Sequence, residues 1–120
     1  MKANELRLGS IISDKGLIST VITIDELGCT TINNGDFSSE VYQTYLEYKP
    51  IPLTEEWLIK FGFLENGYFY HLSGLMIYIN DKEFDYMSVF YNGAVLGVFK
   101  HVHQLQNIYF ALTGEELTIK

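Results

Sequence analysis

The C-terminal end of the sequence carries an amphipathic stretch that limits how the rest of the chain can fold. Between residues 101 and 117 the apolar side chains recur at spacings of three and four, which places them on one stripe of a helix. The stripe consists of Val102, Leu105, Tyr109 and Leu112. Gly114 follows where helices commonly end in a left-handed residue. Because the upstream segments favour short strands, the sequence predicts sheet structure covered by this stripe.

The first part of the chain contains three short β-rich runs separated by turn residues. The runs cover residues 10–13, 17–24 and 29–32, and the turns contain Asp14, Gly16, Gly28 and Gly35. This regular spacing of short strands and tight turns predicts a small meander, similar to the first strands of an SH3-like barrel. We therefore predict an SH3-like β subdomain over residues 1–49.

Residues 40–48 are compatible with two structures. Tyr42, Leu46 and Tyr48 alternate as on a strand, whereas Val41, Tyr45 and Tyr48 would suit a helical turn. We favour a strand, because Pro50 follows and the residue before a proline is driven toward extended geometry. Residues 50–53 are the predicted boundary between two halves of the chain.

The second half, residues 50–120, is predicted to contain a helix, an antiparallel meander and a second helix. Thr54 is a predicted N-cap, followed by Glu55 and Glu56 and an inward face, and Gly62 ends this helix. Asn-Gly pairs at residues 66–67 and 92–93 lie between β-rich runs, which is the strongest short hairpin signal. The predicted strands cover residues 63–65, 68–72, 75–80, 84–91 and 94–99. The expected fold class is α+β, and at 120 residues the two halves are expected to form one compact unit.

The charge pattern excludes several classes of partner. The formal net charge is −7, and the eight Lys and Arg residues are scattered singly along the chain. Phosphate backbones and anionic membranes select clustered basic side chains, so the sequence argues against direct nucleic-acid or membrane binding. No apolar run approaches the length of a spanning helix, and no signal peptide is expected. We therefore expect a cytoplasmic protein.

No constellation for catalysis or metal binding is visible. His101 and His103 are two residues apart but stand at a helix start, and Cys29 is a lone thiol that we expect to be buried. Asp81, Glu83 and Asp85 alternate like the first ligands of a calcium loop, but the required glycine and closing glutamate are missing. The sequence therefore predicts no cofactor, no metal and no enzymatic activity.

The predicted binding residues are uncharged polar and aromatic side chains. His103, Gln104, Gln106 and Asn107 form the polar face at the start of the C-terminal helix and offer a recognition edge. Tyr42 and Tyr45 combine apolar area with a polar tip, as interface residues often do. The sequence leaves open whether these tyrosines are buried or displayed.

Three motifs carry a resemblance to a known group of proteins. They are Met-Lys-Ala-Asn-Glu-Leu-Arg-Leu-Gly at residues 1–9, Pro-Ile-Pro-Leu-Thr-Glu-Glu-Trp-Leu at residues 50–58, and His-Gln-Leu-Gln-Asn-Ile-Tyr-Phe-Ala-Leu-Thr-Gly-Glu-Glu-Leu at residues 103–117. The chain resembles a family of short uncharacterised proteins from phages, prophages and mobile elements of gut anaerobic bacteria. Members often have Asn where this chain has Ser10. The resemblance implies an accessory protein of a mobile element and no catalytic residue.

Two classes of function remain open from the sequence. The first is a small acidic protein-interaction module, an inhibitor or adaptor that binds a host or phage protein. It rests on the acidic balance, the tyrosine-rich strands and the family context. The alternative is a small-molecule or nucleotide-binding protein, or a DNA mimic or other nucleic-acid-associated module. The sequence does not fix the oligomeric state.

Overall fold

A computed structural model describes residues 6–14, 17–25, 27–33, 36–44, 48–67, 69–79 and 87–120. The chain divides into two compact units. The first unit comprises Met1–Ile51 with Val102–Asn107, and the second comprises Pro52–His101 with Ile108–Lys120. The predicted division between residues 49 and 50 thus lies close to the first boundary between the units, which falls between Ile51 and Pro52. It did not anticipate that the first half of the C-terminal helix belongs with the N-terminal strands.

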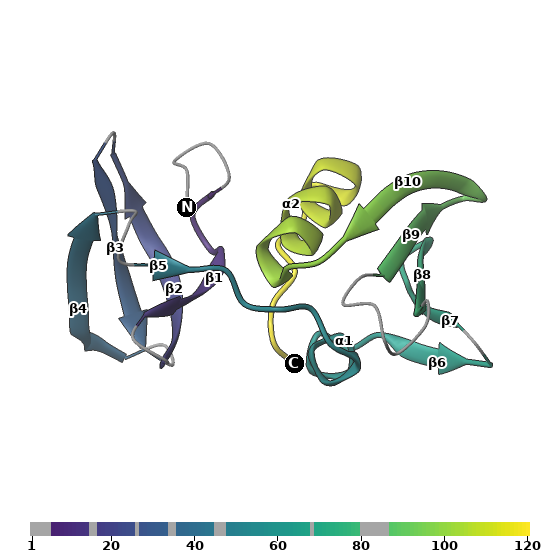
Figure 1. The fold of residues 1–120 in the computed structure, drawn as a ribbon, viewed down its shortest axis with the longest axis horizontal. Coiled ribbons are helices and arrows are strands. Elements are labelled where there is room, and N and C mark those ends of the chain that lie inside the picture. Colours follow the sequence, from purple (N-terminus) through teal and green to yellow (C-terminus); the bar gives the residue numbers. More distant parts are fainter. Residues whose placement is uncertain are drawn as a thin grey trace. The chain divides into compact units, whose positions relative to one another are not determined.

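The first unit is built on one antiparallel sheet (Figure 1). Its strand order is β4-β3-β2-β1-β5. The strands are β1 (Ile11–Asp14), β2 (Leu17–Ile24), β3 (Gly28–Asn33), β4 (Asp36–Thr44) and β5 (Tyr48–Lys49). The single strand predicted over residues 40–48 is corrected, because β4 ends at Thr44 and β5 begins at Tyr48. Tyr48 belongs to β5 and pairs with Asp14 of β1. Local alternation of side chains does not reveal this long-range pairing.

Tyr48 shows that this sheet curls. Its strand, β5, and β4 are the two outermost strands in the sheet order. The Tyr48 hydroxyl nevertheless donates to the carbonyl of Cys29 on β3 at 3.0 Å and lies 3.4 Å from that of Val41 on β4. The sheet is therefore a curled half-barrel, and its interior holds Leu6, Ile12, Val21, Cys29 and Tyr48.

The second unit contains the predicted meander (Figure 1). Each strand pairs antiparallel with the next, in the order β10-β9-β8-β7-β6. The strands are β6 (Leu64–Asn66), β7 (Phe69–Leu72), β8 (Leu75–Ile79), β9 (Met87–Tyr91) and β10 (Ala94–Phe99). The predicted turn at Asn92-Gly93 is confirmed, with φ of 49° and 86° at its two central residues. Positive φ at both positions matches the right-handed twist of a hairpin, and Asn and Gly tolerate it best.

The two helices begin and end close to the predicted residues. Helix α1 (Glu55–Lys60) follows Thr54 and buries Trp57 and Leu58, but the Thr54 side chain makes no capping hydrogen bond. Only the Thr54 carbonyl joins the first turn, by accepting from Trp57 N at 3.1 Å. Helix α2 (Val102–Thr113) ends as predicted, since Gly114 has a φ of 74° and its N–H donates to Phe110. In the described part of the chain no helix has the length and apolar character needed to span a bilayer.

The stripe of α2 is largely confirmed. Val102, Leu105 and Tyr109 are buried, whereas Leu112 is half-buried. Beyond the helix, Leu117 is buried and the N–H of Lys120 donates to the carbonyl of Lys60 at 2.8 Å. The segment after α2 is therefore fixed against the end of α1 within the second unit.

Candidate functional site

The two faces of the second sheet differ in what they contact. One face is buried and apolar, with Tyr70, Leu75, Ile77, Met87 and Val89 at most 6% exposed. The Tyr70 hydroxyl lies 3.3 Å from the Glu55 carboxylate, so α1 lies against this face. Side chains alternate along strands, and the residues between these five therefore point to the opposite side.

We call the opposite side of the second sheet the open face. The register places on it Leu64, Asn66, Phe69, His71, Met76, Tyr78, Ser88, Phe90, Val95 and Val98. None of these residues is charged. Leu64, Val95 and Val98 are 64%, 71% and 51% exposed, and the other apolar members are exposed or half-buried. The open face thus presents apolar and aromatic side chains to the surroundings.

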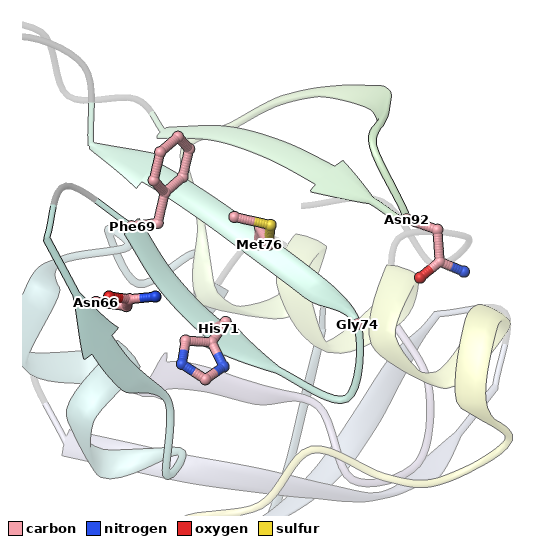
Figure 2. A pocket seen from close by; sticks show the side chains of 6 residues that line it. All are labelled: Asn66, Phe69, His71, Gly74, Met76 and Asn92. Atoms are coloured by element: carbon pink, nitrogen blue, oxygen red, sulfur yellow. The ribbon is translucent and has the colours of Figure 1, made fainter.

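A pocket lies on the open face (Figure 2). Its volume is about 340 Å³, and its walls are Asn66, Phe69, His71, Gly74, Met76 and Asn92. Phe69 and Tyr78 are neighbours across β7 and β8, with ring centroids 5.4 Å apart and planes tilted by 47°. The pocket therefore combines an aromatic wall and a thioether with two amides and an imidazole.

The rim of the pocket is formed by two adjacent hairpin turns. Ser73 and Gly74 connect β7 to β8 with positive φ at both residues, and the N–H of Asn92 donates to the carbonyl of Gly74 at 3.3 Å. A Cβ at Gly74 would lie 3.1 Å from Asn92 Oδ1 and 3.4 Å from the ring of Tyr91. Glycine is therefore favoured at this position by its backbone conformation and by the close approach of Asn92.

The predicted polar face of α2 is divided between the interior and the surface. Gln106 has no exposed area, and both ends of its side-chain amide are hydrogen-bonded. Its Oε1 accepts from Ile11 N at 2.7 Å, and its Nε2 donates to Gly9 O at 3.0 Å. The Gln106 amide thus pairs with the backbone at the start of β1, as a neighbouring strand would.

His103 and Asn107 also take part in the first unit. His103 is only 3% exposed. Asn107 Oδ1 accepts from Arg7 Nε at 2.8 Å, and Arg7 Nη2 donates to the carbonyl of Gln106 at 2.8 Å. Of the four residues predicted on this face, only Gln104 and Asn107 retain partly exposed side chains, so a recognition role there stays a prediction for these two.

These contacts join two of the sequence motifs. Arg7 and Gly9 belong to the N-terminal motif, and Gln106 and Asn107 belong to the C-terminal one. The middle motif is also tied to the start of α2, because Leu53 N donates to Lys100 O and Val102 N donates to Ile51 O. Residues of the three motifs therefore take part in hydrogen bonds that connect distant parts of the chain.

Tyr42 lies on β4 with an exposed side chain, and its hydroxyl donates to the Asp25 carboxylate at 2.8 Å. The backbone N–H of Leu27, the Tyr42 hydroxyl and the N–H of Gly28 together lower the pKa of Asp25. These bonds fix the turn between β2 and β3, while the Tyr42 ring remains 51% exposed. Tyr45 lies outside the described residues.

Cys29 is buried, as predicted. Burial raises the pKa of its thiol to about 11, and burial raises the pKa of Tyr48 to about 12. A protonated thiol in the interior of the half-barrel is a poor nucleophile at neutral pH. Within the described ranges no three His, Cys, Asp or Glu side chains are placed to hold a metal ion, and Asp81, Glu83 and Asp85 lie outside those ranges.

No protein-family model, curated protein or solved structure matches this chain. Its function is therefore inferred from the surfaces of the described residues, in particular from the open face and its pocket.

The residues of the open face were not among the predicted binding residues. A signal for them was nevertheless present, because strands β7 to β10 contain no Asp, Glu, Lys or Arg. An antiparallel sheet with one solvated face normally carries polar and charged side chains at every second position. In β7 to β10, charged residues are missing from the positions on both faces of the sheet. This pattern indicates a second apolar surface beside the buried one.

Proposed function

We propose that the protein is a small acidic protein-interaction module and that the open face is its binding surface. The observation that supports this is the uncharged, aromatic composition of a sheet face whose opposite side already forms the core. The cores of protein interfaces are enriched in Tyr, Phe and Met and depleted in Lys, Glu and Asp. Phe69, Met76, Tyr78 and Phe90 lie on the open face, and none of the residues described on this face is charged.

The charge of the chain indicates the kind of partner. With a formal net charge of −7, the protein attracts basic surfaces over a range of about 10 Å in 0.1 M salt and repels acidic ones. We therefore propose a partner protein with an apolar centre surrounded by Lys and Arg side chains. The family resemblance supports a host or phage protein in this role, with the module acting as inhibitor or adaptor.

For the first unit we propose an SH3-like barrel. Supporting observations are the four-strand meander, the short β5 that returns to pair with β1, and the curl of the sheet. Such small barrels serve many unrelated functions, so this assignment describes architecture and does not select a ligand.

A small-molecule or nucleotide-binding function is the second candidate, because the open face contains a pocket of about 340 Å³. Ligand pockets commonly occupy roughly 300–1,000 Å³, so this one is small for a nucleotide. A nucleotide or metabolite that raises the melting temperature, and raises it further as the logarithm of its concentration increases, would support this alternative.

The test uses matched substitutions at exposed apolar residues of the two units. The double variant V95K/V98K places two charges on the open face, where Val95 and Val98 are 71% and 51% exposed. The control L17K/L27K makes the same chemical change at Leu17 and Leu27, which are 55% and 74% exposed on the first unit. Because all four side chains are exposed, we expect both variants to fold with little loss of stability.

The measurement is affinity capture from a lysate of the native host, followed by the dissociation constant for the purified partner. We expect V95K/V98K to weaken binding by about tenfold or more, which is about 1.4 kcal/mol. The control should bind like the unmodified protein. A partner that tolerates V95K/V98K, or the absence of any partner, would overturn the proposal.

A further inference from the structure

Building on the proposed function, we infer that the pocket on the open face receives one aromatic side chain with a polar tip, a tyrosine or tryptophan of the partner protein. The pocket lies among the apolar residues of the open face (Figure 2). Anchors of protein interfaces are typically Tyr, Trp and Arg side chains that fill such a pocket near the centre of the contact.

The walls favour an aromatic ring. Phe69 and Met76 provide an aromatic surface and a polarizable sulfur, both of which make favourable contacts with a second ring. The volume of about 340 Å³ lies near the lower limit for ligand pockets, roughly 300 Å³, so it suits a single large side chain.

The polar lining selects a neutral group over a charged one. Asn66, His71 and Asn92 contribute amides and an imidazole, and none of the six lining residues is a carboxylate or a Lys or Arg. A buried Arg or Lys would lose its hydration without gaining an opposite charge. A phenolic hydroxyl or an indole N–H needs only one uncharged partner, and both amides and imidazole provide such partners.

The two turns of the pocket rim are joined by a backbone hydrogen bond. Gly74 O accepts from the N–H of Asn92, and both residues occupy tight turns with positive φ. Binding therefore requires little ordering of the rim, which reduces the entropic cost of filling the pocket.

Two methionines provide a direct test on the intact chain. Met76 lines the pocket, whereas Met87 is 5% exposed on the buried face of the same sheet. With methionine methyl groups labelled by ¹³C, the Met76 signal reports on the pocket and the Met87 signal serves as an internal control. The probes are N-acetyl-tyrosinamide, N-acetyl-tryptophanamide, N-acetyl-leucinamide, N-acetyl-argininamide and adenosine.

We expect the tyrosine and tryptophan amides to shift the Met76 methyl signal saturably, with dissociation constants on the order of millimolar for ligands of this size. The leucine and arginine amides should bind at least threefold more weakly, and the Met87 signal should not move. N66A should weaken the tyrosine amide severalfold by removing a polar group of the lining. E65A is the matched control, because Glu65 is the neighbour on β6 whose side chain points to the other side of the sheet.

Several outcomes would overturn the inference. They are an unmoved Met76 signal, equal binding of the leucine amide, preference for the arginine amide, or tighter binding of adenosine, which would assign the pocket to a small ligand. If V95K/V98K abolishes partner binding while the amides leave Met76 unmoved, the interaction function stands and only the pocket assignment fails. If V95K/V98K leaves partner binding intact, the proposed function fails whichever amide binds.

Discussion

The two units of the chain bury different kinds of side chain. All buried polar and charged side chains among the described residues belong to the first unit: Ser10, Asp14, Ser19, Thr31, His103 and Gln106. The described buried residues of the second unit are aliphatic or aromatic, together with Met87. The interior of the first unit thus combines apolar packing with buried polar side chains, whereas the interior of the second unit consists of apolar packing.

This difference clarifies the meaning of the open face. In the second unit the buried core lies on one side of the sheet, whereas the apolar side chains on the other side are exposed or half-buried. In the first unit, β2 and β3 contain six Ser, Thr and Asn residues, while Leu17, Ile18 and Ile24 of β2 are also exposed. The uncharged open face and its pocket belong to the second unit, which supports a binding role for that unit.

The largest expected effect is a cavity in the apolar core of the second unit. Ile77→Ala removes a fully buried side chain from the middle strand of the sheet and should lower the free energy of unfolding by about 2–5 kcal/mol. Tyr78→Ala changes the next residue, which is 37% exposed on the open face, and should cost clearly less. Urea unfolding measures both, and equal losses would contradict the contrast between the two faces.

In the first unit the strongest expected effect comes from a hydrogen-bonding side chain. Gln106→Leu keeps the approximate size but leaves Ile11 N–H and Gly9 C=O without the Gln106 amide. Each unsatisfied buried group costs about 1–3 kcal/mol, so we expect a loss of about 2–4 kcal/mol in urea unfolding. The control Gln104→Leu alters a half-buried glutamine on the same helix and should change stability by less than about 1 kcal/mol. A stabilised Gln106→Leu variant would show that packing, not hydrogen bonding, dominates here.

The interior of the first unit should also respond to alkaline pH. The ordinary pKa values of Cys29 and Tyr48 are 9.0 and 10.0, and burial raises them to about 11 and about 12 in the folded chain. Between pH 9 and 12 the unfolded chain therefore binds fewer protons, and the free energy of unfolding falls as pH rises. Below pH 9 these groups contribute no pH dependence. Tyr48→Phe should reduce the slope above pH 10 in urea unfolding at stepped pH, and an unchanged slope would rule out Tyr48 as its source.

The smallest expected effect concerns the turns at the pocket rim. Gly74→Ala and Gly93→Ala both place a side chain at positive φ, 83° and 86°, and should each cost about 1 kcal/mol. Only the Cβ at position 74 approaches another residue, Asn92 Oδ1 at 3.1 Å, whereas nothing lies within 4 Å at position 93. Gly74→Ala should therefore be the more destabilising of the two by thermal unfolding. The reverse order would show that Asn92 moves away without cost.

Local patterns determined both helices and one hairpin turn of the second sheet. The stripe of α2, its stop at Gly114, the inward face of α1 and the Asn92-Gly93 turn were all predictable, because each depends on residues within a few positions of one another. The side-chain cap of Thr54 was predicted and is absent, since the backbone carbonyl alone joins the first turn.

Tertiary structure decided the features that join distant parts of the chain. The pairing of β5 with β1 and the burial of Gln106, which bonds residues 95 and 97 positions away, follow from contacts that no local period encodes. The pocket likewise requires the register of four strands to bring Asn66, Met76 and Asn92 together. Sequence alone determined most of the described segments that form strands and helices, because backbone conformation depends strongly on near neighbours. Which polar groups are buried, and which apolar face stays open, depended on long-range pairing, because only the assembled sheet decides which side of each strand faces a core.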